Sequence, residues 1–262
     1  MSLNVRTITA TRYVTPLREG GSLPAIVEAD DEGLYVLKFR GAGQGPKSLI
    51  AELVAGEIGR ALGLPVPEIV FVELDAALAG TEPDPEIQDL LKASVGLNLA
   101  LDYLPGSVTY DPLVERLSPE LASSVVWFDS YVTNVDRTAR NANMLMWHKR
   151  LWLIDHGAAL YFHHTWANYL ERSRAAFDHV KDHVLLPSAS LIRELDETLA
   201  ARLSAEVVGD IVNLIPEAWL DTDSRFAGAD EFRQAYADYL TGRLEPPRLF
   251  AQEAARVRAS LV

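Results

Sequence analysis

The period of the hydrophobic pattern changes near Pro105-Gly106-Ser107, and this change restricts the folds open to the chain. Before it, apolar and polar residues alternate in short runs separated by turn residues, which favours β-strands. After it, apolar residues recur at helical spacing over longer segments. The pattern predicts an α+β protein in which a β-rich part precedes a helical part. We expect two lobes, residues 1–104 and residues 105–262, with this Pro-Gly-Ser segment as the hinge.

The first part contains strand-like runs and one helix. The strand candidates are Arg12–Leu17, Leu23–Ala29, Leu34–Arg40, Glu68–Leu74 and Leu97–Tyr103. Asp30-Asp31-Glu32-Gly33 is expected to join the second and third strands as a hairpin, with Gly33 supplying the turn. A helix from about Ser48 to Leu62 is expected to end at Gly63, because glycine commonly follows a helix. The acidic, Pro-rich segment Thr81–Asp89 is expected to be a loop.

The second part is expected to be mostly helical around one more hairpin. Ser118 and Pro119 have the residue types that begin a helix, and this helix should run to about Thr133. The polar segment Asn134–Asn141 reads as a loop. After it come the hairpin strands Met144–Trp147 and Leu151–Ile154, and helices from about Arg172 onward that break near Pro187, Pro216 and Pro246-Pro247.

Composition excludes several classes of protein. The 262 residues include no cysteine, so disulfides and thiolate metal sites cannot form. The net charge of −13 argues against nonspecific binding to nucleic acid or to anionic lipid. No apolar run is long enough to cross a bilayer, and the first residues lack the apolar region of a secretory signal. These features predict a cytoplasmic protein.

Lys38 is unusual because it lies within an apolar strand. In this strand Tyr35, Leu37 and Phe39 should share one face, and Val36 and Lys38 the other. An edge-strand lysine that reaches solvent would be an ordinary explanation. The functional alternative is a cation that faces the phosphates of a nucleotide.

The polar loop between the first helix and the hairpin of the second part is also unusual, since apolar elements flank it on both sides. Polar loops held by rigid elements are common places for functional sites. In this loop Asp136 could accept a proton from a hydroxyl group, and the side-chain oxygen of Asn141 could bind a hard cation. Arg137 or Arg140 could stabilise negative charge, or pair with a nearby acid. A solvated turn remains the plain alternative.

Asp155 follows the apolar run Leu151–Ile154 and precedes His156-Gly157. A carboxylate at the end of a buried strand costs free energy unless it is paired or metal-bound. One Asp and one Asn suit Mg²⁺, which takes few protein ligands and completes its shell with phosphate or water oxygens. Alternatively, Asp155 caps the turn before Gly157.

Lys38, Asp136, Asn141 and Asp155 supply together what phosphoryl transfer needs: a cation, a base and metal ligands. Their order along the chain and the spacing of Asp136 and Asn141 match the D-x-x-x-x-N loop of kinases, and Asp155-His156-Gly157 lies where that fold has D-F-G. The sequence therefore predicts a kinase that uses ATP and Mg²⁺.

The chain resembles the small HipA-like kinases, and more distantly the phosphatidylinositol kinases. The resemblance covers roughly residues 12–160 and rests on the segments TPLREGGSLPAIV, LYVLKFRG, LIAELVAGEIGRALGLPVPE, TNVDRTARNANML and LWLIDHG. It implies a two-lobed protein-kinase-like fold and transfer of the ATP γ-phosphoryl group to a protein serine or threonine. A small-molecule or lipid acceptor is the main alternative within the enzyme class. A nucleotide-binding regulator without turnover is the alternative outside it.

The resemblance also assigns roles to single residues. It implies that Asp136 is the catalytic base and that Asn141 and Asp155 bind Mg²⁺. Nucleotide contacts would come from the turn Gly20-Gly21-Ser22, from Lys38, from Glu52, and from the backbone of Asp102, Tyr103 and Leu104. It further implies an antitoxin-like partner, and makes Ser22 the positional candidate for inhibitory phosphorylation.

The partner of Lys38 is open between two glutamates. The resemblance points to Glu52, by its distance from Gly63-Leu64-Pro65. A helical wheel instead places Glu57 in the middle of the apolar face and Glu52 opposite. We expect Glu52, with Glu57 as the named alternative.

Histidines offer a third class of function, a metalloenzyme. His179 and His183 are four residues apart but lack the H-E-x-x-H pattern, so solvated helix histidines are expected. His163 and His164 could join His156 near the cleft, but no further ligand of convincing spacing follows.

Overall fold

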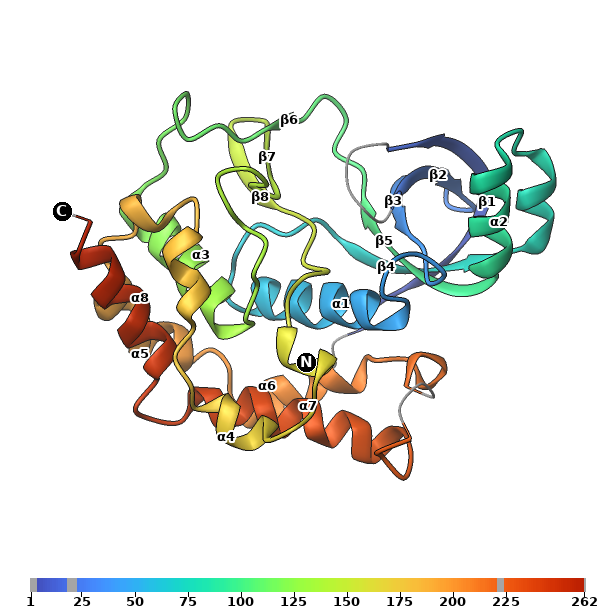
Figure 1. Ribbon diagram of the computed structural model, residues 1–262. Coiled ribbons are helices and arrows are strands. Elements are labelled where there is room, and N and C mark those ends of the chain that lie inside the picture. The colour runs from blue at the N-terminus through green and yellow to red at the C-terminus, as the bar shows by residue number, and fades with distance from the viewer. Residues whose placement is uncertain (1–3, 18–22, 221–223, 262) are drawn as a thin grey trace.

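The computed structural model describes residues 4–17, 23–220 and 224–261. Its first part is a closed five-stranded barrel in the order β1-β2-β3-β5-β4 (Figure 1). The strands are β1 (Thr7–Pro16), β2 (Ala25–Ala29), β3 (Leu34–Lys38), β4 (Ile69–Leu74) and β5 (Gly96–Asp102). Neighbours run antiparallel except β1 and β4, which are parallel and close the barrel.

The two faces of β3 differ as the sequence predicts. Tyr35 and Leu37 are buried in the core of the barrel. Val36 and Lys38 lie on the other face, outside that core. The β2–β3 hairpin is confirmed, but its left-handed residue is Glu32 rather than Gly33. Gly33 is required for space instead, because a Cβ there would lie 2.6 Å from the ring of Tyr35.

Helix α1 (Pro46–Ala61) runs between the barrel and the helical part (Figure 1). It ends as predicted at Gly63, whose φ is 79°. The Leu64 N–H donates to the Gly59 carbonyl (2.9 Å) and the Gly63 N–H to the Arg60 carbonyl (2.9 Å). This is the hydrogen-bond pattern of a Schellman C-cap. The tight end turns the chain directly into the segment before β4.

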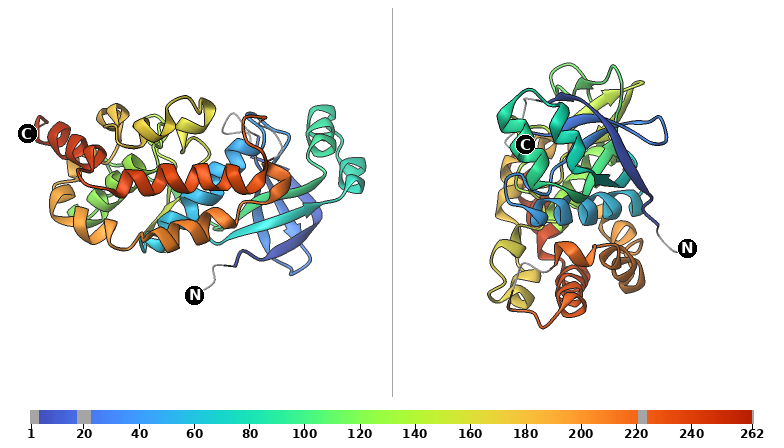
Figure 2. Two further views of the ribbon diagram at one scale, coloured as in Figure 1. Left: turned by 90° about the horizontal axis from the view of Figure 1, so that it is seen from below. Right: turned by 90° about the vertical axis from the view of Figure 1, so that its right-hand side faces the viewer.

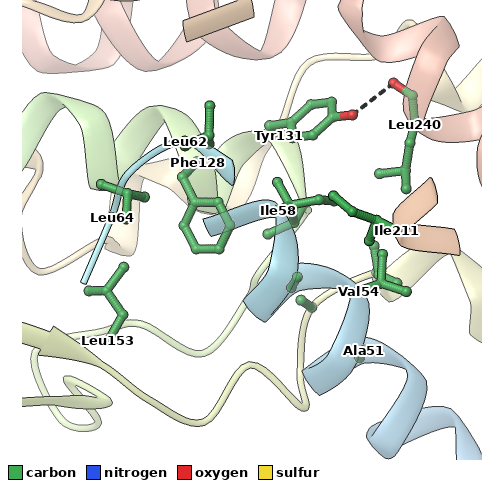
Figure 3. Close-up of a cluster of buried hydrophobic side chains, with 14 of the residues drawn as sticks. Ala51, Val54, Ile58, Leu62, Leu64, Phe128, Tyr131, Leu153, Ile211 and Leu240 are labelled. Atoms are coloured by element: carbon green, nitrogen blue, oxygen red, sulfur yellow. Dashed lines mark hydrogen bonds between the residues drawn. The ribbon is translucent and has the colours of Figure 1, made fainter. Parts of the chain in front are cut away.

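Helix α1 is buried on every side, from Leu49 to Gly59. Figure 3 shows Val54 and Ile58 packed among side chains of the helical part, which include Phe128 and Ile211. The helical wheel divided this helix into an apolar and a polar face, and that division is wrong. Between Leu49 and Gly59 the helix has no solvated face, so its two glutamates, Glu52 and Glu57, lie in the protein interior.

The second part is mostly helical and also contains a small sheet in the order β6-β7-β8. These strands are β6 (Val108–Thr109), β7 (Met144–Trp147) and β8 (Arg150–Leu153). The helices are α3 (Pro119–Tyr131), α4 (Tyr169–Ser173), α5 (Ile192–Ala200), α6 (Ala205–Asn213), α7 (Ala229–Leu244) and α8 (Leu249–Ala259), with short 3₁₀ turns between several of them. Two views show α8 at the end of the molecule opposite the barrel (Figures 1 and 2).

The predicted start of α3 is confirmed, since the Ser118 hydroxyl accepts a hydrogen bond from the Leu121 N–H (3.2 Å). The predicted loop Thr81–Asp89 is wrong. Helix α2 (Pro85–Ala93) begins there, and the Asp84 carboxylate caps it by accepting from the Glu86 N–H (3.0 Å). An Asp before a Pro at the first helical position is a start signal, because that position needs no N–H donor.

The fold is thus α+β, with a small β-rich first part and a helical second part, as the sequence predicts. The buried side chains of α1 belong to the core of the helical part, although α1 lies within residues 1–104. Among the described residues, no helix is long and apolar enough to cross a membrane.

Candidate active site

Lys38 links the barrel to the helical part. Its ammonium group forms ion pairs with Glu52 of α1 and with Asp155, whose Oδ1 lies 2.5 Å away. Burial alone would lower the pKa of Lys38, but the two carboxylates outweigh it and hold the pKa above its ordinary value. Lys38 therefore stays charged where three elements meet.

Glu52, and not Glu57, is the glutamate beside Lys38. Glu57 pairs with Arg60 one helical turn away (3.3 Å). Glu52 is fully buried, and its second oxygen accepts a hydrogen bond from His156 Nδ1 (3.1 Å). Burial raises the pKa of Glu52, but Lys38 and His156 outweigh this effect and hold the pKa well below its ordinary value. The Glu52 carboxylate is therefore ionised and fixed from both sides.

The polar loop after α3 carries Asp136 at its centre. Asp136 Oδ2 accepts hydrogen bonds from the side-chain amides of Asn141 (2.7 Å) and Asn143 (3.3 Å). Its backbone N–H donates to Asn134 Oδ1 (3.1 Å). Partial burial raises the pKa of Asp136. The hydrogen bonds from the two amides lower this pKa, but by less, so it stays above its ordinary value. A carboxylate in this setting is held in place and is more basic than an exposed one.

A buried ionic network supports the same loop from beneath. Asp129 of α3 accepts from Asn134 Nδ2 (2.8 Å), Arg137 Nε (2.6 Å) and His183 Nε2 (3.0 Å). Burial raises the pKa of Asp129, but the Arg137 charge and the His183 hydrogen bond outweigh it and hold the pKa well below its ordinary value. Arg137 also donates to the carbonyls of Ala142 (3.3 Å) and Asn143. The network thus ties both ends of the loop to α3.

His183 is part of this network, so the expectation that it is a solvated helix histidine is wrong. It is only 6% exposed and follows a short 3₁₀ turn. The Leu185 N–H donates to its Nδ1 (3.0 Å), so Nδ1 carries no proton and Nε2 donates to Asp129. His179, by contrast, is exposed. Within the described ranges, no group of three His, Cys, Asp or Glu residues is arranged to hold a metal ion by itself.

Two side-chain oxygen atoms, one on Asn141 and one on Asp155, accept no hydrogen bond from a described residue. Asn141 uses its amide N–H to bond Asp136, so its Oδ1 has no donor among the described residues. Asp155 uses Oδ1 for Lys38, and its Oδ2 is similarly unpaired within the described chain. A carboxylate and an amide oxygen are hard donors, so this pair fits Mg²⁺ if phosphate and water oxygens complete the shell.

Asp155 has a left-handed backbone (φ 56°), which an L-residue adopts at a cost of roughly 1–2 kcal/mol. The Ile154 N–H before it donates to the Asn143 carbonyl (3.1 Å), and Asn143 also has positive φ. Strain of this kind is common at functional sites, where the surroundings hold the backbone in place.

The segment after β5 carries two backbone groups without a hydrogen-bond partner among the described residues. The N–H groups of Asp102 and Tyr103 donate to the carbonyls of Glu68 (2.9 Å) and Leu34 (3.0 Å). The Tyr103 carbonyl and the Leu104 N–H bond to no described residue. The two groups belong to one trans peptide unit and point in opposite directions, so only one of them can face a purine base. The turn Gly20-Gly21-Ser22 lies outside the described residues.

Sequence reasoning missed Asp129, Asn143, His156 and His183 as parts of the site. Asp129 had a detectable signal, since a charged residue in the apolar run Val125–Tyr131 needs a buried partner. His183 had none, because its partner lies 54 positions earlier. His156 is recognisable only once Glu52 is known to lie beside it.

A two-lobed fold with a lysine, a buried glutamate and the D-x-x-x-x-N loop at the junction defines the kinase class. The model of the HipA-like kinase family matches residues 11–247. The chain belongs to this family, which supports a phosphotransferase. No curated protein sequence matches the chain.

One solved structure supports the fold, and two others show a weaker likeness. The proinflammatory kinase CtkA of Helicobacter pylori aligns over 98% of this chain and 99% of its own, with a TM-score of 0.54 at 13% identity. The Golgi casein kinase with Mn and ADP bound covers 96% of this chain and 75% of its own (TM-score 0.49, 10% identity). A second structure of the Golgi casein kinase covers 94% and 77% (TM-score 0.47, 11% identity). The first likeness shows the kinase-like fold. The other two, with TM-scores below 0.5, carry no argument.

Proposed function

We propose that this protein transfers the γ-phosphoryl group of ATP, with Mg²⁺, to the hydroxyl of a protein serine or threonine. The observation that supports this proposal is the junction formed by Lys38, Glu52 and Asp155, which come from three separate elements. Family membership supports the reaction class. The choice of a protein acceptor follows the resemblance to HipA-like kinases.

In this proposal the nucleotide lies between the barrel and the helical part. The backbone of the segment Asp102 to Leu104 contacts the adenine, and the Leu104 N–H, which bonds to no described residue, is one available donor. Lys38 contacts the phosphates, and Glu52 with His156 behind it keeps the ammonium group aimed at them. Gly20-Gly21-Ser22 would cover the phosphates. The role of these three turn residues in the proposal rests on the sequence alone.

Asp136 is the proposed base. Its carboxylate would accept the proton of the acceptor hydroxyl as the oxygen attacks the γ-phosphorus, while the bond from that phosphorus to the β–γ bridging oxygen breaks and ADP leaves. Asn141 and Asp155 would hold the metal through their unpaired oxygens. The bound metal would neutralise charge that develops on the phosphates. On nucleotide binding, the phosphates would replace Asp155 as a partner of Lys38, and this exchange frees the whole Asp155 carboxylate.

The test is phosphoryl transfer by the purified protein. Radiolabel from γ-labelled ATP is expected to enter a protein of a host-cell lysate with Mg²⁺ and not after chelation. Asp136→Asn should lower the rate about 10²–10⁴-fold, because it removes the base. Asp210→Asn, an exposed change on α6, serves as the matched control and should keep the wild-type rate.

Each alternative has its own outcome. Label that enters a lipid or a metabolite fraction, and no protein, would assign the acceptor to that class. If Mg-ATP raises the melting temperature of wild type and of Asp136→Asn but no labelled product forms, the protein is a nucleotide-binding regulator and the kinase proposal is wrong.

A further inference from the structure

A cavity of about 440 Å³ lies in the helical part, away from the Lys38 junction. One wall is the segment after β6, from Tyr110 to Pro119. The opposite wall is Val184 to Ser190, and Arg258 of α8 completes the lining. None of these residues has a role in the proposed phosphoryl transfer.

Both walls are attached to the loop that carries Asp136. The Val184 N–H donates to the Arg137 carbonyl (3.1 Å), and the Tyr110 N–H donates to the Met144 carbonyl (2.9 Å). Arg137 follows Asp136 directly, and Met144 follows the end of the loop. Each wall is therefore one hydrogen bond from the Asp136 loop or its continuation, so an acceptor protein that reaches Asp136 could extend to the cavity.

The lining carries two arginines that pair with no carboxylate. The side chains of Arg116 and Arg258 have no hydrogen bond or ion pair with another described residue, and Arg258 Nε is buried without a partner. Their neighbour Arg256 in α8, by contrast, pairs with Glu253 (2.6 Å). In a chain of net charge −13, two unpaired arginines at one cavity favour an anionic occupant.

One carboxylate, that of Glu115, also lines the cavity among the described residues. Its side chain is exposed and forms no ion pair with either arginine. It therefore leaves both guanidinium groups available, although it reduces the net positive charge of the lining. A basic occupant would meet two like charges and one opposite charge, which is unfavourable.

Two large apolar side chains are exposed beside the cavity. Leu113 and Val114, on the segment between β6 and α3, are 93% and 80% exposed. Pro112 and Leu117 on the same segment line the cavity. Exposed apolar side chains beside a cavity are typical of a protein-binding surface. A phosphate ion or an oligonucleotide would leave them uncovered, whereas a peptide could contact them and the arginines together.

We propose that this cavity docks an acidic segment of the acceptor protein, with its carboxylates at Arg116 and Arg258 and an apolar side chain against Leu113 and Val114. The inference rests on the proposed function only for the statement that the docked protein is the acceptor. Docking itself requires neither ATP nor Asp136, so it can be measured separately.

The test is fluorescence anisotropy with a labelled peptide of about twelve residues, rich in glutamate and leucine, and the full protein without nucleotide. The double variant Arg116→Glu/Arg258→Glu is expected to bind about tenfold or more weakly than wild type, because two attractive contacts become repulsive. Arg193→Glu is the matched control. Arg193 is exposed, forms no ion pair among the described residues, and lines a different cavity. The Arg193→Glu variant should therefore bind the peptide like wild type.

Salt and peptide charge provide further readouts. Wild-type affinity should fall as ionic strength rises, and the salt dependence should be weaker in the double variant. Leu113→Ser/Val114→Ser should weaken binding without changing the salt dependence. If the double variant is less stable on urea unfolding, Arg116→Glu alone, on an exposed segment, repeats the comparison and should still weaken binding severalfold.

The inference is overturned if a lysine-rich peptide of the same length binds as tightly, if an oligonucleotide displaces the acidic peptide, or if the arginine variants bind like wild type. Acidic peptide that binds as expected while no phosphoryl transfer occurs would refute the kinase proposal and leave docking intact. Transfer to lysate protein that is equally fast in wild type and the double variant would refute docking of the acceptor and leave the kinase proposal intact.

Discussion

Replacing Asp129 by Asn tests the buried network beneath the Asp136 loop. The Asp129 carboxylate accepts from three donors, those of Asn134, Arg137 and His183. An Asn side chain has one acceptor oxygen and two N–H donors, so it cannot satisfy all three. It also leaves the Arg137 guanidinium, 1% exposed, without a counter-charge.

The expected cost follows from that loss of charge. Breaking a buried ion pair by removing one partner costs about 3–5 kcal/mol. For a chain of this size that lowers the melting temperature by roughly 6–20 °C. Urea unfolding at pH 7 measures the free energy, and Asp210→Asn, an exposed change on α6, should stay within about 0.5 kcal/mol of wild type.

A double-mutant cycle separates the ion pair from other effects. Once Arg137→Met has removed the buried cation, Asp129→Asn no longer leaves a charge unpaired. We expect the two changes to cost about 1–3 kcal/mol less together than the sum of the single costs. Additive costs would mean that the two side chains do not stabilise each other.

The same network predicts how stability depends on pH. The folded-state pKa of Asp129 is depressed, so its contribution is complete above the unfolded-state value of about 3.9 and is lost as the pH falls toward the folded-state value. The difference between wild type and Asp129→Asn should therefore shrink below about pH 4. A difference under about 1 kcal/mol at pH 7, or one that is unchanged at pH 3.5, would refute the reasoning.

Three further outcomes are expected. Glu52→Gln should slow phosphoryl transfer roughly a hundredfold, because Lys38 loses its buried partner and its alignment, whereas Glu57→Gln should change the rate less than about fivefold. If the two variants lose similar amounts of activity in steady-state kinetics, Glu57 also supports Lys38 and the assignment to Glu52 alone is wrong. Because burial raises the pKa of Asp136, kcat/KM should begin to fall on acidification at a pH above the ordinary Asp value of about 3.9, and a pH–rate profile with its limb at or below that value would contradict the role. Gly63→Ala should cost roughly 1–2 kcal/mol in urea unfolding, since φ is 79° there, and an equally stable variant would exclude strain.

Local sequence patterns were sufficient to predict most helices and strands. Alternation along Leu34–Lys38, the Ser118-Pro119 start of α3 and the Gly63 end of α1 each follow from neighbouring residues, so they could be predicted without the fold. Helix α2 was misread because the Pro-rich, acidic composition of Thr81–Asp89 was taken to indicate a loop, whereas Pro85 is the first helical residue.

Long-range pairing could not be predicted in the same way. Whether Glu52 or Glu57 lies beside Lys38 depends on how α1 is rotated between the two lobes, and a helix buried all round gives no polar face to reveal that rotation. Likewise, His183 lies beside Asp129 only because the chain returns to α3 after many residues.

By itself, the sequence determined the order of elements and the chemical types brought to the site: a strand lysine, the D-x-x-x-x-N loop, and Asp155 after a buried strand. These depend on local propensity and spacing. Tertiary structure alone decided which carboxylate neutralises Lys38, which buried residues hold the Asp136 loop, and that Arg116 and Arg258 line one cavity. Those contacts join residues far apart in the chain, so they are set by how the barrel, α1 and the helical part pack, and by the free energy of leaving a buried charge unpaired.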